Sequence, residues 1–77
     1  MLDYFRALGF KDISKNILTT TFDTRGVRFE VQKVGPRICI YRMVADSSKH
    51  GKCVYDGFVD SQRFVNSLVL NLGITEI

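Results

Sequence analysis

The alternation of hydrophobic and polar positions is clearest in the middle of the chain. Over residues 27–32 every second side chain is apolar, which is the pattern of a strand with one buried face. Residues 38–44 are apolar on both faces, as expected of a central strand. The pair Gly35-Pro36 lies between the two segments and predicts a hairpin turn.

Two further strands are expected beside this hairpin. Residues 17–22 are β-branched and aromatic, which suits a pleated surface, and the turn-forming residues 23–26 connect them to the alternating segment. After the hairpin, a polar loop at residues 46–51 leads to a strand expected over Cys53–Val59. Because short turns join all these segments, we expect an antiparallel meander of four strands.

The N-terminal residues predict a short helix. Leu2, Phe5 and Leu8 recur every third residue, and Gly9 lies where a helix C-terminal glycine belongs. The following residues, 11–16, are polar and are interpreted as a loop.

The C-terminal residues predict a longer, amphipathic helix. Its apolar stripe consists of Phe64, Val65, Leu68, Val69 and Leu72. Asp60 or Ser61 is the expected N-cap, and Gly73 ends the helix. The predicted fold class is therefore α+β, in the order α-β-β-β-β-α, as a single domain over residues 1–77. The C-terminal helix covers one face of the sheet, and the short N-terminal helix lies at an edge or on the other face.

The hairpin turn sets the pairing of the two central strands. A turn centred on Gly35-Pro36 places Val31 opposite Ile40 and Phe29 opposite Arg42. The expected core face then carries Val27, Phe29, Val31, Ile38, Ile40 and Val44. Arg42 is the exception on this face, and we expect its stem to pack at the rim while its head stays in water.

The opposite face combines aromatic, basic and sulfur-containing side chains. If Val54 and Phe58 are buried with the core, alternation places Cys53 and Tyr55 on this second face beside Cys39. A face of this composition is too apolar for an idle surface, so we expect a partner or the N-terminal helix to cover it. The candidate partner- or nucleic-acid-binding residues are Arg28, Arg37, Tyr41, Met43, Lys52 and Tyr55.

Composition narrows the class of protein. The chain has 77 residues, of which 45% are hydrophobic and 25% are charged, so it is expected to form one small globular domain. It contains no apolar run of membrane-spanning length and no signal-peptide pattern, which favours a cytoplasmic protein without a membrane partner. So small a core gains stability from self-association, since disulfides and structural metal are not expected here. The net charge of +3 permits an acidic partner but does not require one.

Two binding functions remain open from these observations. The first is a small accessory or regulatory protein, of the kind that phages and mobile elements carry, which docks its second sheet face on a protein or on its own copy. The alternative is a nucleic-acid-binding module that uses the same face, where arginines neutralise phosphates and tyrosines stack on bases.

Residues 27–72 also resemble known nucleic-acid-binding modules in topology. Three antiparallel strands followed by a helix, joined through the sequence Asp56-Gly57-Phe58-Val59-Asp60-Ser61, resemble AP2-type and phage-integrase arm-binding DNA modules, whose free sheet face enters a groove. The helix–strands–helix outline is similar to double-stranded-RNA-binding domains. This chain departs from both, because Glu30 lies on the face and the last helix begins with a single cation, Arg63. These are analogies of fold, which do not assign function.

Catalysis is not expected. Cys39 and Cys53 are interpreted as reduced thiols, and one chain lacks the Cys and His ligands of a zinc site. The carboxylates show no pairing of the glycosidase or metal-site type, and so short a chain has little room for a deep pocket. We therefore expect no cofactor and no small-molecule substrate.

Overall fold

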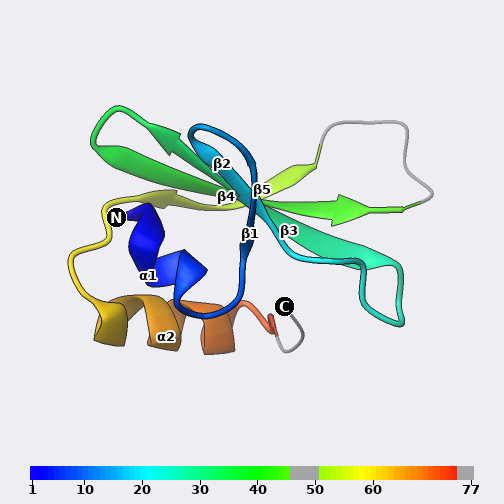
Figure 1. The fold of residues 1–77 in the computed structure, drawn as a ribbon. Coiled ribbons are helices and arrows are strands. Elements are labelled where there is room, and N and C mark those ends of the chain that lie inside the picture. Colours follow the sequence, from blue (N-terminus) through cyan, green and yellow to red (C-terminus); the bar gives the residue numbers. More distant parts are fainter. Residues whose placement is uncertain (46–50, 75–77) are drawn as a thin grey trace.

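The computed structural model describes residues 1–45 and 51–74, and the loop expected at 46–51 lies outside this description except for its last residue. The described residues form two helices and five strands (Figure 1). In chain order they are α1 (Leu2–Arg6), β1 (Lys11–Ser14), β2 (Ile17–Thr19), β3 (Val27–Val34), β4 (Arg37–Val44), β5 (Lys52–Gly57) and α2 (Gln62–Asn71).

The sheet is an antiparallel meander, as predicted, but it has five strands instead of four. Its order is β1-β2-β3-β4-β5, so every strand pairs with its neighbour in sequence. The additional strand, β1, lies where the sequence predicts a loop. All its residues are exposed and Ile13 is bulged out of the pairing with β2. Because β1 buries no side chain and is a strand through backbone pairing alone, its sequence shows no apolar alternation that could have predicted a strand.

The central hairpin has the predicted register. Val31 pairs with Ile40 and Phe29 with Arg42, and the two strands close through Gly35-Pro36. Gly35 has a φ of +60°. A positive φ followed by the φ near −65° that proline imposes fits a type II′ turn, whose twist matches that of paired strands.

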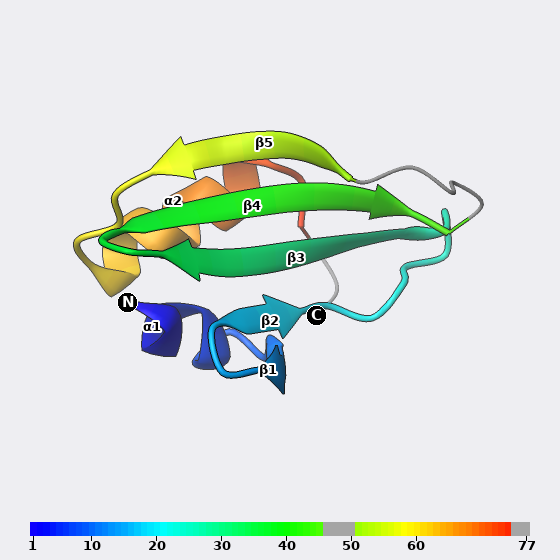
Figure 2. The same ribbon diagram turned by 90° about the horizontal axis from the view of Figure 1, so that it is seen from above.

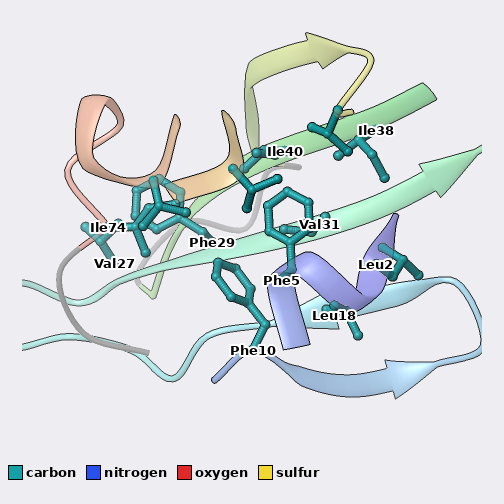
Figure 3. Packing of buried hydrophobic residues seen from close by; sticks show 13 residues of the cluster. Leu2, Phe5, Phe10, Leu18, Val27, Phe29, Val31, Ile38, Ile40 and Ile74 are labelled. Atoms are coloured by element: carbon teal, nitrogen blue, oxygen red, sulfur yellow. The ribbon is translucent and has the colours of Figure 1, made fainter. Parts of the chain in front are cut away.

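Both helices pack on the same side of the sheet. Figure 2 shows α2 behind β4 and β5, with α1 beside β2. Their buried side chains join one cluster with the predicted core face of β3 and β4 (Figure 3). Val44, predicted on that face, is the exception, since it lies at the end of β4 and is 40% exposed. Phe5 and Phe10, for example, meet edge to face at 5.4 Å between ring centroids. The N-terminal helix therefore contributes to the core and leaves the second face uncovered.

A bulge in β5 overturns part of the predicted alternation. Ile40 pairs with Tyr55 and Tyr41 pairs with Cys53, so Val54 is an extra residue between the two pairs. Cys53 lies on the second face as predicted. Tyr55, however, lies on the helix side, where it packs against the core, and Phe58 is 64% exposed instead of buried. One inserted residue reverses the face of everything that follows it.

The C-terminal helix begins and ends where the sequence predicts. Ser61 Oγ accepts a hydrogen bond from the Phe64 amide at 3.1 Å. After the last turn, Gly73 has a φ of +76° and the Ile74 amide bonds back to Val69 O at 3.0 Å. No helix among the described residues is long and apolar enough to span a membrane.

Candidate functional site: the open sheet face

The face of the sheet turned away from both helices is the candidate site, and we call it the open face. The register places four of the six predicted site residues on it, namely Arg28, Arg37, Tyr41 and Met43. The other members are Ile17, Thr19, Glu30, Gln32, Val34, Cys39, Cys53 and Asp56. Most of these side chains are half-buried, because they lean on one another across the strands.

The remaining two predicted residues lie on the other side of the sheet. Lys52 pairs with Arg42, so it lies at the rim of the helix side. Tyr55 donates its hydroxyl hydrogen to Phe58 O at 2.6 Å, and its ring lies 6.2 Å from that of Phe64 in α2. A Cβ on Gly57 would come within 3.0 Å of the Tyr55 hydroxyl, so the glycine leaves room for this ring.

One arginine of the open face is held against β2. Arg28 Nη1 donates to Thr19 Oγ1 at 2.9 Å and lies 3.4 Å from Glu30 Oε2. The guanidinium also lies over the ring of Phe22, 5.3 Å from its centroid, which is a cation–π geometry. These contacts hold the charged head of Arg28 against β2 and the residues that follow it.

The other arginine is paired across β4 and β5. Arg37 Nη2 lies 2.8 Å from Asp56 Oδ1. The two arginines balance the two carboxylates of Glu30 and Asp56, so the part of the open face on β3, β4 and β5 carries no net charge among the described residues. Lys11, opposite Thr19, adds one cation at the β1 edge. Sequence alternation missed Asp56 because it grouped this residue with Val54 and Phe58, on the wrong side of the bulge.

A hollow of about 310 Å³ lies in the open face. It is lined by Glu30, Gln32, Tyr41, Met43 and Gly51. Gln32 Nε2 donates to Glu30 Oε1 at 2.8 Å, which holds the carboxylate at the wall. A Cβ on Gly51 would overlap the Met43 sulfur and come within 2.8 Å of Arg42 O. Gly51 therefore has to be a glycine for the chain to pass this close to β4, and the sequence alone gave no sign of this.

The Cys39 thiol of the open face is a poor nucleophile. Cys39 and Cys53 are both free. Cys39 Sγ lies 3.6 Å from Asp56 Oδ1, to which its thiol donates. Desolvation, reinforced by the Asp56 carboxylate, raises the pKa of Cys39, and desolvation also raises the pKa of Tyr41. Both groups therefore stay protonated at neutral pH, the state in which neither is a good nucleophile.

Among residues 1–45 and 51–74 no three His, Cys, Asp or Glu side chains are arranged to hold a metal ion. Comparisons with protein-family models, with curated proteins and with solved structures found no match for this chain. The topological resemblances to DNA- and RNA-binding modules therefore remain analogies of element order.

Proposed function

We propose that this protein is a non-catalytic binding protein that self-associates through the open face. The observation that carries the proposal is the combination of a half-buried face, which has Tyr41 and Met43 between two arginines, with the packing of both helices on the opposite side. Tyrosine, methionine and arginine are enriched at the centres of protein interfaces. A second copy is the favoured occupant because the charges of this face on β3, β4 and β5 balance, so that part does not repel its own image, and because a core this small gains stability from association.

The edges of the sheet point to the same mode of association. The two edge strands, β1 and β5, each carry a bulge, at Ile13 and at Val54. Bulges twist an edge away from strand pairing with another chain. Association is therefore expected face to face and not through a continuous sheet.

The ion pairs of the open face disfavour nucleic acid at this site. Phosphate binding needs cations that are available to replace counterions. Arg28 and Arg37 already lie against Glu30 and Asp56. A phosphate backbone placed on this face would meet those two carboxylates as well.

Sedimentation velocity over about 10 µM to 1 mM protein tests the proposal, a range that covers weak dimers. We expect a concentration-dependent dimer for the wild type and a monomer for Tyr41→Asp and for Met43→Asp. The matched control is Leu70→Asp, which adds the same charge at an exposed apolar position of α2, on the helix side, and should leave the dimer intact. Far-UV circular dichroism shows whether each variant is folded. A wild type that stays monomeric throughout the range would overturn the proposal.

A further inference from the structure

The hollow of the open face is lined by hydrogen-bond acceptors and by apolar surface. Glu30 and Gln32 line it from β3, and Tyr41 and Met43 line it from β4. Among the described residues that line it, none is a lysine or an arginine. A carboxylate beside an aromatic ring and a thioether suits a cation on an aliphatic chain, because the charge and the methylene groups each meet a matching surface.

The Glu30 carboxylate can accept a further hydrogen bond. Gln32 Nε2 donates to Oε1 at 2.8 Å, and Arg28 Nη1 lies 3.4 Å from Oε2, which is the longest of the five ion pairs among the described residues. A carboxylate has about four lone-pair sites, so about two remain. Arg28 is held on the β2 side of Glu30 by Thr19, whereas the hollow lies toward β4. A cation in the hollow therefore meets Glu30 from the side that Arg28 leaves open.

Lys11 is a cation on the open face without an ion pair. It pairs with Thr19 in the register of β1 and β2, so the two side chains share this face, and Lys11 is exposed. Among residues 1–45 and 51–74 no carboxylate lies within ion-pairing distance of its ammonium group. The next residue, Asp12, pairs with the buried Leu18 and is bound by Arg6 at 2.8 Å, on the helix side. The Lys11 ammonium is therefore available to a partner.

The register does not place the other unpaired cations of the described chain on the open face. It places three of them on the helix side, namely Lys33, Arg42 and Lys52. Lys15 lies in the turn between β1 and β2, and Arg63 lies in α2. Arg37 lies on the open face, but its guanidinium is 2.8 Å from Asp56 Oδ1. Lys11 is therefore the cation that the open face can offer to a carboxylate of another molecule.

Within one chain, Lys11 is kept away from Glu30. Lys11, Thr19 and Glu30 lie in one row across β1, β2 and β3. The Arg28 guanidinium lies over this row, with Nη1 2.9 Å from Thr19 Oγ1 and 3.4 Å from Glu30 Oε2. Because like charges repel, Arg28 separates Lys11 from the carboxylate of its own chain. In a face-to-face dimer a second copy approaches the hollow from above the sheet and does not pass Arg28.

We propose that the hollow of each copy receives the side chain of Lys11 of the partner subunit. This contact rests on the self-association proposed above, and it fixes which parts of the two open faces meet. The ammonium group binds Glu30, and the methylene chain packs on Tyr41 and Met43. A volume of about 310 Å³ is at the lower end of the range of about 300–1,000 Å³ for ligand pockets, so the hollow suits a single side chain. In a two-fold dimer the contact occurs twice.

Exchange of the two charges between copies tests the contact. Lys11→Glu and Glu30→Lys are prepared as separate variants, and sedimentation velocity is measured on each alone and on an equal mixture. Each variant alone should dimerise at least about 10-fold more weakly than the wild type, because both of its contacts then join like charges. In the mixture both contacts join opposite charges, so a heterodimer should form with an affinity within about 10-fold of the wild type. Mixing changes nothing inside either chain, so such a rescue reports a contact between chains.

A single neutral substitution gives the magnitude. Lys11→Gln should raise the dissociation constant of the dimer about 5- to 50-fold, since each dimer loses two contacts. The effect should be larger at about 50 mM than at about 200 mM salt, because salt screens the charges. Lys11 is exposed, so its replacement leaves the core intact. The matched control is Lys15→Gln, which removes the same charge from the neighbouring turn and should change the dissociation constant less than about twofold.

Two results would overturn this contact and leave self-association in place. One is a wild-type dimer that Lys11→Gln weakens no more than Lys15→Gln does. The other is a mixture of the two charge-reversed variants that dimerises no better than either variant alone. A wild type that stays monomeric up to about 1 mM would instead overturn self-association itself, and this contact with it.

Discussion

Replacing Thr20 by valine tests how β2 is joined to the core. Thr20 is buried, with 3% of its surface exposed, and lies where β2 stops pairing with β3. Its amide donates to Phe29 O at 2.9 Å, as in an antiparallel ladder. The return bond goes to the side chain instead, because the Phe29 amide donates to Thr20 Oγ1 at 2.8 Å. The threonine carbonyl meanwhile accepts from the Thr19 hydroxyl at 3.0 Å.

Valine has the shape of threonine but no acceptor. The Thr20→Val variant therefore leaves the Phe29 amide buried without its partner, and Phe29 itself is 5% exposed. A buried donor without an acceptor costs about 1–3 kcal/mol. In a domain of this size each kcal/mol lowers the midpoint of thermal unfolding by about 4–8 °C. The loss is a large part of the stability that so small a core supplies.

Urea unfolding followed by far-UV circular dichroism measures the loss. The control is Thr21→Val, the same substitution at the next residue, which is exposed and should change stability by less than about 0.5 kcal/mol. Hydrogen exchange of the Phe29 amide provides a second measurement, because this amide should be protected in the wild type and exchange faster in Thr20→Val. Equal stability of the two variants, with an unchanged Phe29 amide, would refute this account of the strand end.

Two further substitutions test single contacts. Asp23 accepts from the amides of Arg25 and Val27 at 2.8 and 3.0 Å, and the hydrogen bond from the Arg25 side chain, followed by that from the Val27 amide, lowers the pKa of Asp23. A carboxylate whose pKa is lowered by folding stabilises the fold at pH values above its unfolded-state pKa, and this stabilisation is lost as pH falls. In urea titrations, Asp23→Asn should therefore be less stable than wild type at about pH 6 and about as stable as wild type at about pH 2.5. An equal difference in stability at both pH values would contradict the assignment. Ser61→Ala removes the N-cap of α2 and should lower the free energy of unfolding by about 0.5–2 kcal/mol in the same assay. The control Ser67→Ala, at an exposed position within the helix, should not lower it. An equal loss of stability in both variants would argue against the cap.

Local sequence determined the elements whose signals are strong and short in range. The Gly35-Pro36 turn set the register of β3 and β4, because a two-residue loop leaves a single pairing. The cap at Ser61, the apolar stripe and Gly73 located α2 in the same way. Four of the six candidate residues reached the open face for this reason, since all four lie on the hairpin.

Tertiary structure decided the rest. Alternation counts residues along one strand, and a single extra residue, Val54, reverses the count, so Tyr55 lies across the sheet from the other candidates. Lys52 lies there by alternation itself, because its neighbour Cys53 is on the open face. Whether that residue is bulged depends on pairing with β4, which is far away in sequence. The same holds for β1, which is a strand only through backbone pairing with β2, and for α1, whose place beside β2 depends on packing between whole elements. Neither kind of contact produces a hydrophobic pattern within a single segment of sequence.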